Sequence, residues 1–309
     1  MRLIFLGTPA FAVPTLEKIV GVGHTVLTVV TQPDRPRGRG QQPAASPVKE
    51  TALRLGLPIF QPERVRRPES VEHLRSLPTD AMVVVGYGQI IPQAVIDLAP
   101  LGIINVHASL LPKYRGAGPI QWAIRNGEAR TGVTTMRINA GLDTGDMLLK
   151  AETDIGPEEN AIDLGHRLAA MGADLLVETL AGLWAGSIVP ETQDDAQASF
   201  APLLKKEDGL IHWNETAESI HNLVRGFQPW PGAHTTFRGQ MLHVWRSRVT
   251  GSGDRAAPGR IASVKPLAVT CGEGGLELLD VQLEGRKRIS AADFANGQRL
   301  IENEILGAS

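Results

Sequence analysis

The chain has 309 residues, a formal net charge of −2, and hydrophobic and charged fractions of 42% and 21%. This is the composition of an ordinary globular protein, and it excludes a strongly basic nucleic-acid binder without excluding a local basic patch. The length exceeds the usual size of one domain, so we expect two. The single cysteine, Cys271, excludes a disulfide framework and any cysteine-cluster metal site, and we expect it to be buried in a protein of a reducing compartment.

The N-terminal stretch "MRLIFLGTPAFAVPTL" resembles the start of a signal peptide, but Gly7, Pro9 and Pro14 interrupt its apolar run and no small-residue cleavage site follows. We find no run that approaches the roughly 18 to 20 apolar residues of a membrane helix. The sequence therefore predicts no secretion, no membrane span and a cytoplasmic location.

The first half of the chain alternates apolar runs with helical patterns. A strand over residues 2–6 leads through Gly7-Thr8-Pro9 into a helical pattern that runs from Phe11 to Val20. Further strands are predicted over 25–31, 81–85, 103–107, 131–138 and 146–155, and further helices over 47–55, 118–126 and 160–186. This alternation predicts an α/β domain with a Rossmann-like, mostly parallel sheet.

The second half has a different pattern. Residues 189–206 are polar and lack periodicity, which predicts an interdomain linker. A short helix over 219–227 precedes short strands over 234–239, 241–249, 259–264, 267–274 and 276–285, separated by Gly-rich turns. These strands predict a small, closed or half-closed, OB-like β-barrel. We thus expect an N-terminal domain over 1–188, a linker over 189–206 and a C-terminal domain over 207–309.

Two polar side chains occur at the end of the predicted strand 103–107. Asn105 and His107 are two residues apart, so strand geometry places both on one face. Ligands of open α/β sheets bind at the carboxyl ends of the strands, where these residues lie. A lone histidine is more often structural than catalytic, but the asparagine partner and the strand-end position favour a functional pair.

A third candidate is Asp143 in "NAGLDTGDML", residues 139–148. Its flanking glycines allow the backbone to approach a ligand closely, and its carboxylate suits the orientation of a histidine or the acceptance of a proton. The structural alternative is an aspartate that satisfies a tight turn. Asp-Thr-Gly also occurs in aspartic proteases, but those enzymes require two carboxylates that share a proton, and this chain contains one such tripeptide.

Cofactor and metal motifs are absent from the sequence. Gly7-Thr8-Pro9-Ala10 occupies the place of a dinucleotide-binding G-x-G-x-x-G but lacks the second and third glycines. The eight histidines show neither H-x-x-x-H nor H-E-x-x-H spacing, so no zinc site is predicted.

Residues 31–49, "TQPDRPRGRGQQPAASPVK", form a basic segment after a predicted strand. Its cations are Arg35, Arg37, Arg39 and Lys49, and within the segment they face only Asp34. The segment is predicted to be a mobile loop that either grips phosphates or lies solvated on the surface. Lys113 and Arg115, in the loop after His107, are candidates for a phosphate clamp.

Several long motifs together resemble the methionyl-tRNA formyltransferase family. They are "LGTPAFA", "TQPDRPRGRG", "VVVGYGQIIP", "NVHASLLPKYRGAGPI", "GLDTGDML" and "FQPWPGAHT", and they occur in order over essentially the whole chain. The resemblance implies an enzyme of translation initiation that transfers the formyl group of 10-formyltetrahydrofolate to the α-amino group of methionyl initiator tRNA. It also implies that the second domain lies on the tRNA side, and the chemistry of the transfer requires no metal.

The resemblance further assigns residues. Asn105, His107 and Asp143 match the catalytic trio of the family. The segments that match its folate-contacting positions contain Ser109, Leu110, Leu111, Pro112, Gly86, Tyr87 and Ile90. The basic segment, with Arg35, Arg37, Arg39 and Lys49, matches the arm that enters the acceptor stem, and Lys113 and Arg115 are equally consistent with the anionic tail of folate or with solvent. Second-domain cations that would extend the tRNA footprint are Arg225, Arg246, Arg248, Arg286, Lys287 and Arg288.

The chemistry of formyl transfer agrees with the trio. Attack of a neutral amine on the formyl carbon develops negative charge on oxygen, so hydrogen-bond donors at that oxygen are the main requirement. Asn105 and His107 can donate, and Asp143 can orient the imidazole or help to remove a proton. Two rivals stay open: an amino-sugar formyltransferase, and a non-catalytic RNA-binding or folate-sensing protein. We expect a monomer.

Overall fold

The computed structural model describes residues 1–37, 42–251 and 257–307. These residues form two compact units, neither of which is continuous in sequence. The first consists of residues 1–116, 131–153 and 165–200, and the second of residues 117–130, 154–164 and those from 201 onward. Residues 189–200 of the predicted linker therefore pack with the first unit, whereas residues 201–206 belong to the second.

The first unit contains a seven-stranded sheet in the order β5-β2-β1-β6-β7-β8-β9. The strands are β1 (Arg2–Gly7), β2 (Thr25–Val30), β5 (Ile59–Phe60), β6 (Ala81–Val85), β7 (Ile103–His107), β8 (Arg130–Arg137) and β9 (Met147–Asp154). The pairs from β5 through β7 are parallel, and β8 runs antiparallel to β7. The predicted Rossmann-like, mostly parallel sheet is confirmed.

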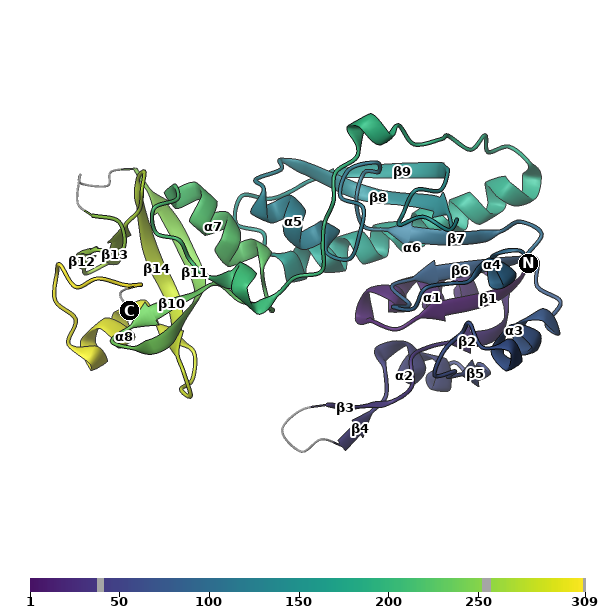
Figure 1. The fold of residues 1–309 in the computed structure, drawn as a ribbon, viewed down its shortest axis with the longest axis horizontal. Helices are drawn as coiled ribbons and strands as arrows, with labels where there is room; N and C mark the ends of the chain where they lie inside the picture. The colour runs from purple at the N-terminus through teal and green to yellow at the C-terminus, as the bar shows by residue number, and fades with distance from the viewer. Residues whose placement is uncertain (38–41, 252–256, 308–309) are drawn as a thin grey trace. The chain divides into compact units, whose positions relative to one another are not determined.

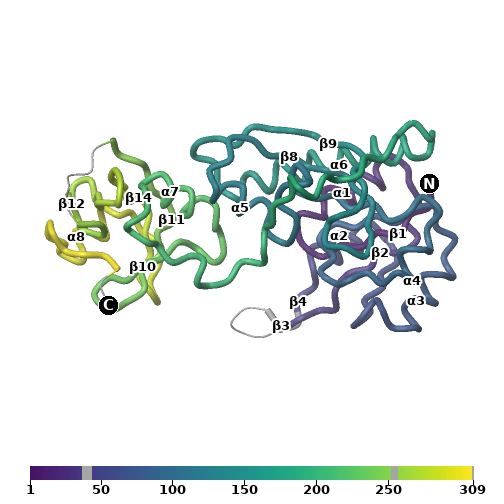
Figure 2. Tube along the Cα trace, turned by 45° about the horizontal axis from the view of Figure 1, so that its top comes forward, coloured from purple at the N-terminus to yellow at the C-terminus, as the bar shows by residue number. Residues whose placement is uncertain are grey.

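Helices cover both faces of this sheet (Figures 1 and 2). On one face, Ile4 and Leu6 of β1 pack in a buried cluster with Leu74 of α3 (Pro68–Arg75) and Val95 of α4 (Gln93–Ile96). The opposite face carries α1 (Val13–Gly21), which follows a 3₁₀ turn (Ala10–Ala12), α2 (Pro47–Arg54) and α6 (Ala161–Ala185). Ion pairs join α1 to its neighbours on this face, from Lys18 to Asp174 of α6 and from Glu17 to Arg54 of α2.

Helix α6 is 25 residues long and, by length and composition, could cross a membrane. The prediction that no run approaches the length of a membrane helix is therefore wrong for this helix. Its apolar stripe instead packs on the sheet. A Cβ added to Gly172 would lie 2.7 Å from Val106 of β7, and Thr179 hydrogen-bonds Thr135 of β8 at 2.8 Å. Close packing against strands explains the apolar composition of a core helix.

The basic segment contains a short antiparallel ribbon of β3 (Arg35–Arg37) and β4 (Gln42–Ala44), with Arg35 opposite Ala44. Figure 1 shows the two strands projecting from the sheet of the first unit. The helix α2 begins just after the ribbon, where Ser46 caps its N-terminus by accepting a hydrogen bond from the Lys49 backbone N–H.

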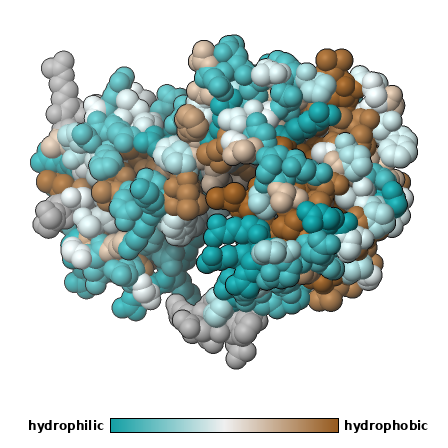
Figure 3. All heavy atoms as spheres, turned by 45° about the vertical axis from the view of Figure 1, so that its right-hand side comes forward, coloured by the Kyte–Doolittle hydropathy of each residue, from teal (hydrophilic) through white to brown (hydrophobic). Residues whose placement is uncertain are grey.

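The face of the molecule drawn in Figure 3 is largely hydrophilic, with hydrophobic side chains gathered in separate patches.

The second unit combines helices with an antiparallel sheet in the order β10-β11-β14-β13-β12, to which β15 adds beside β14. Its strands are β10 (His234–Phe237), β11 (Gln240–Thr250), β12 (Ile261–Val264), β13 (Leu267–Thr270), β14 (Gly275–Leu283) and β15 (Ile289–Ser290). Its helices are α5 (Pro119–Arg125), α7 (Ala217–Gly226), α8 (Ala291–Gln298) and a 3₁₀ turn (Lys206–Gly209). The sheet is a half-barrel, so the half-closed form of the predicted barrel is the one observed.

The half-barrel encloses an aromatic core that includes Trp213, Phe227, Phe237 and Phe294. Cys271 lies in this core with 3% of its surface exposed, and burial raises the pKa of its thiol to about 11. The prediction of a small buried cysteine is confirmed.

Candidate active site

The end of β7 places Asn105 and His107 on one face of the sheet, as the period-two argument predicts. Asn105 lies opposite Met136 of β8 and His107 opposite Thr134. The intervening residue, Val106, points to the other face, where it contacts Gly172 of α6. Both polar side chains are enclosed, with 8% of Asn105 and 6% of His107 exposed.

The orientation of the His107 imidazole is set by the loop that follows it. The ring Nε2–H donates to the backbone carbonyl of Tyr114 at 2.9 Å, because a carbonyl can only accept. The other ring nitrogen, Nδ1, lies 3.7 Å from Oδ2 of Asp143. The structure therefore brings together two residues that are 36 positions apart in sequence. When the ring is protonated, Nδ1 and Asp143 form an ion pair.

Asp143 projects from a tight turn between β8 and β9. Its backbone is in the left-handed region at φ 51°, and its Oδ2 accepts a hydrogen bond from the Gly116 N–H at 2.9 Å. Gly145 is required in this turn, because an added Cβ would lie 1.8 Å from the Arg137 carbonyl oxygen. The Asn139 side chain also braces the turn by accepting from the Gly141 N–H and the Thr144 hydroxyl. The carboxylate is thus held toward His107 by backbone geometry.

The side-chain amide of Asn105 differs from its neighbours. Among residues 1–37, 42–251 and 257–307, no group forms a side-chain hydrogen bond with it, whereas the polar groups of His107 and Asp143 are engaged. Enclosed polar groups are normally hydrogen-bonded, so a free amide at a strand end is a group available to a ligand.

Gln193 was not identified from the sequence, although it supports the Asp143 turn directly. Its Nε2 donates to the carbonyls of Asp143 and Gly145, both at 2.8 Å, and its Oε1 accepts from Nε of Arg115 at 2.9 Å. Gln193 is 7% exposed and lies in the polar segment predicted to be a linker. No periodicity or motif marks it there, because its partners are distant in sequence.

Arg115 is 4% exposed and lies between Gln193 and the carboxylate of Asp195, to which Nη2 lies at 2.8 Å. Of its candidate roles, exposure to solvent is therefore wrong. Arg115 is a buried structural cation. Its neighbour Lys113 is exposed, as a surface cation would be.

The loop over residues 109–113 is fixed by internal hydrogen bonds. The Ser109 hydroxyl donates to the Lys113 carbonyl at 2.6 Å. Thr134 donates to the Ser109 carbonyl and accepts from the Leu111 N–H. The Leu111 side chain packs with Met136 and Met147, while Leu110 and Pro112 are half-buried. The conformation of this loop is therefore set before any ligand arrives.

The end of β6, next to β7 in the sheet, holds three more of the assigned residues. Gly86 has φ 58°, and an added Cβ would lie 2.8 Å from Pro9. The Tyr87 side chain points into the core with 2% exposed, burial raises its pKa to about 12, and its carbonyl accepts from Thr8 and Gln32. Ile90 is 89% exposed. Gly86 and Ile90 are therefore exposed at the surface, whereas Tyr87 is buried.

The basic segment is more paired than its sequence indicates. Arg35 forms an ion pair at 3.0 Å with Glu63, which lies outside the segment. Lys49 pairs with Asp34 at 2.6 Å, and Asp34 also accepts from Gln61. These hydrogen bonds, that of Lys49 first, hold the pKa of Asp34 below its usual value. The backbone of Arg37 lies in β3, and Arg39 lies outside the described residues.

Two features limit the cationic surface of the second unit. Arg225 is buried, with 9% exposed, and donates to the carbonyls of Gly156 and Glu159, so it is not part of a surface footprint. Arg246 and Arg288 share Asp280, and Arg248 pairs with Glu277. In the described part of the chain, no three His, Cys, Asp or Glu side chains are grouped as metal ligands would be.

Family models give the class of protein that this fold and site define. Residues 1–180 match the model described as "Formyl transferase", and residues 203–299 match "Formyl transferase, C-terminal domain". The chain is 74% identical to the methionyl-tRNA formyltransferase of Solibacter usitatus over 99% of both chains. It is 55% identical to that of Koribacter versatilis, again over 99% of both. The chain belongs to the methionyl-tRNA formyltransferase family.

Solved structures of lower identity share the fold. An N-formyltransferase from Helicobacter canadensis, in complex with folinic acid and dTDP-3-aminofucose, has a TM-score of 0.69 at 17% identity and covers 94% of this chain and 100% of its own. HypX from Aquifex aeolicus, in complex with tetrahydrofolic acid, has a TM-score of 0.65 at 14% identity over 100% of this chain and 51% of its own.

Proposed function

We propose that this protein transfers the formyl group of 10-formyltetrahydrofolate to the α-amino group of methionine on initiator tRNA. Full-length identity of 74% to a methionyl-tRNA formyltransferase supports this activity. Two observations support the site: Asn105 and His107 share one face at the carboxyl end of β7, and Nδ1 of His107 lies 3.7 Å from Oδ2 of Asp143. We propose these three residues as the catalytic groups of the reaction.

In the proposed reaction, the neutral methionyl nitrogen attacks the formyl carbon and forms a new C–N bond. The carbonyl oxygen takes up negative charge, and the free amide of Asn105 donates a hydrogen bond to it there. Collapse of the tetrahedral intermediate breaks the bond to the folate nitrogen. That nitrogen takes up one proton, and the attacking nitrogen loses one.

His107 and Asp143 are proposed to handle the proton of the attacking nitrogen. Because Nε2 of His107 donates to Tyr114, Nδ1 is the ring nitrogen that remains for the reaction. Asp143 faces Nδ1 and stabilises the imidazolium when this nitrogen is protonated. The same protonated Nδ1 can also donate to the developing oxyanion, so both roles considered for His107 require this nitrogen.

Binding roles are proposed for two further groups of residues. The folate co-substrate is placed along the loop that contains Ser109, Leu110, Leu111 and Pro112 and along the neighbouring strand end with Gly86, Tyr87 and Ile90. Since the Tyr87 side chain is buried, its part would be played by backbone atoms. The tRNA is placed on the basic segment with Arg35, Arg37, Arg39 and Lys49. Because Lys49 forms an ion pair with Asp34, part of its contribution to tRNA binding would be to hold the ribbon in place.

The functional division into a catalytic region over 1–188, a linker over 189–206 and a tRNA-side region over 207–309 is likewise proposed. A cytoplasmic location and a monomeric state remain predictions. Size-exclusion chromatography with light scattering would test the latter, since a monomer corresponds to 33.2 kDa.

The deciding experiment offers one donor and several acceptors. The protein is mixed with 10-formyltetrahydrofolate and methionyl initiator tRNA, methionyl elongator tRNA or a dTDP-amino sugar. We expect formyl-methionyl-tRNA from the initiator acceptor, formed about 10²- to 10³-fold more slowly by Asn105→Ala under the same conditions. Transfer to the amino sugar alone would support an amino-sugar formyltransferase, and turnover of no acceptor would support a binding protein.

A further inference from the structure

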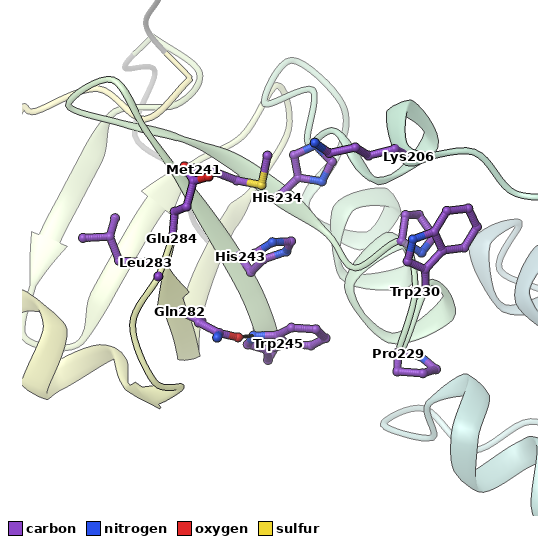
Figure 4. A pocket seen from close by; sticks show the side chains of 12 residues that line it. Lys206, Pro229, Trp230, His234, Met241, His243, Trp245, Gln282, Leu283 and Glu284 are labelled. Carbon is purple, nitrogen blue, oxygen red and sulfur yellow. Dashed lines mark hydrogen bonds between the residues drawn. The ribbon is translucent and has the colours of Figure 1, made fainter. Parts of the chain in front are cut away.

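The second unit contains a pocket that the proposed reaction does not use. It has a volume of about 410 Å³ and opens beside the half-barrel sheet. Figure 4 shows the residues that line it, which include Trp230, His234, His243, Trp245, Lys206 and Gln282. The segment "FQPWPGAHT", which stood out in the sequence without receiving a role, forms one side of it.

Aromatic rings form the wall of this pocket. Strand β11 presents His243 and Trp245 with their rings stacked on each other, with ring centroids 5.5 Å apart and planes 20° from parallel. The His234 ring continues the row at 5.7 Å from that of His243. In Figure 4 the indole of Trp230 lies across the pocket from these three rings. Trp230 is 52% exposed, so it contributes little to the core.

The position of Trp245 is built into the strand. Val244 pairs with Val281 and Arg246 with Asp280, so Trp245 is the extra residue of a β-bulge. Bulges re-aim a side chain and are enriched beside functional sites. The Trp245 carbonyl, displaced from the ladder, accepts a hydrogen bond from Gln228 at 2.8 Å.

Other contacts fix the indole and leave room beside it. The Trp245 Nε1–H donates to Gln282 at 2.9 Å, and Gln282 in turn donates to the Arg286 carbonyl. Gly232 has φ 76°, and an added Cβ would lie 3.3 Å from His243 and 3.4 Å from Trp245. A larger residue at 232 would therefore crowd these rings.

One cation, Lys206, lines the pocket. Arg288, which pairs with Asp280 and is not a lining residue, lies nearby with its guanidinium 5.8 Å from the centroid of the Trp245 ring. Planar rings beside cations are what proteins use to hold unstacked bases of RNA, because a base stacks on the ring while its phosphates meet the cations. Glu284, which also lines the pocket, disfavours a purely phosphate ligand and suits a base with N–H donors.

We propose that this pocket binds one unstacked nucleobase of the tRNA substrate, stacked on the His243–Trp245 wall or on Trp230, with Lys206 toward the sugar-phosphate chain. The inference rests on the proposed function, because it takes the acceptor of that reaction as its ligand. It assigns a role in substrate binding and none in the chemical step.

The test compares steady-state formylation by Trp245→Ala, Trp230→Ala and a matched control, Trp184→Ala. Trp184 is an exposed tryptophan of α6, 65% exposed, in the other unit. Loss of a base-stacking ring should raise KM for methionyl initiator tRNA roughly tenfold in the two pocket variants. We expect kcat and KM for 10-formyltetrahydrofolate to stay within twofold of wild type, and Trp184→Ala to match wild type throughout.

A second measurement locates the contact. Ultraviolet irradiation of the wild-type protein with uncharged initiator tRNA, followed by mass spectrometry, should yield nucleotide adducts on the peptides that contain Trp230 or Trp245. If Trp245→Ala fails to fold, the exposed Trp230 keeps the proposal testable.

The two proposals fail in different ways. A wild-type protein that formylates no methionyl-tRNA overturns the proposed function. A wild-type protein that does so, while Trp230→Ala and any folded Trp245→Ala retain its KM for tRNA, overturns the nucleobase pocket alone.

Discussion

Two polar regions follow parallel strands of the same sheet, and their environments are opposite. The region after β7, with Asn105 and His107, is enclosed and almost every polar group in it is hydrogen-bonded. The ribbon after β2 keeps the charged side chain of Arg35 at the surface. In an enclosed region an unpaired group is costly, so the free amide of Asn105 is informative. At the surface an ion pair contributes little, so pairing reveals less about function.

The largest effect should come from the enclosed region. Asn105→Ala removes the donor proposed for the oxyanion, so kcat should fall about 10²- to 10³-fold, with KM for either substrate changed by less than threefold. Rapid-quench measurement of a single turnover would separate the chemical step from binding. A fall in kcat of less than tenfold would contradict the assignment of the buried, unpaired Asn105 amide as the oxyanion donor.

Gln193 should come next, because it acts through the Asp143 turn and does not touch the reacting atoms. Small misplacement of a catalytic group can cost about 10²-fold, so Gln193→Ala should lower kcat roughly 10- to 100-fold. Gln193→Glu keeps the size and the contact to Arg115 but loses both N–H donors, and it should be equally impaired.

The pH profile distinguishes positioning from a merely structural role for Gln193. If Gln193 acts through Asp143 and His107, the pH dependence of kcat should shift in both variants. An unchanged profile with a lowered melting temperature would assign Gln193 to stability only.

The basic segment over residues 31–49 should give a smaller effect of a different kind. Arg39→Ala should weaken formylation through tRNA alone, with KM for tRNA raised several-fold and the slope of log affinity against log salt reduced by about one. KM for 10-formyltetrahydrofolate should not change. An equal loss of affinity for 10-formyltetrahydrofolate would contradict the assignment of the basic segment to tRNA binding.

The smallest effect should come from Lys49→Met, which breaks the ion pair with Asp34. The pKa of Asp34 lies below its usual value of about 3.9, so the pair contributes at neutral pH and is lost as pH falls through the lowered pKa. In an NMR titration, the Asp34 midpoint should move up toward the usual value in Lys49→Met. A midpoint that stays in place would assign the shift to Gln61 instead.

Some parts of the molecule followed directly from local patterns. The apolar run of β6 and the alternation after it predicted a parallel sheet, and the two-residue spacing of Asn105 and His107 predicted their common face. Helix α8 and the short α3 were not predicted, because their apolar stripes are brief. The half-barrel order of β10 to β15 also required the structure, since strand spacing does not specify which strands pair.

The sequence by itself determined the fold class, the family and the common face of Asn105 and His107, because strand periodicity and long ordered motifs are local properties of the chain. Tertiary structure alone decided that Arg115 is buried, that Gln193 holds the Asp143 turn and that Trp245 faces a pocket. The contact between Arg115 and Gln193 joins residues 78 apart, and that between Gln193 and Asp143 residues 50 apart. Hydrogen bonds over such separations depend on how the whole chain packs, so no local pattern predicts them.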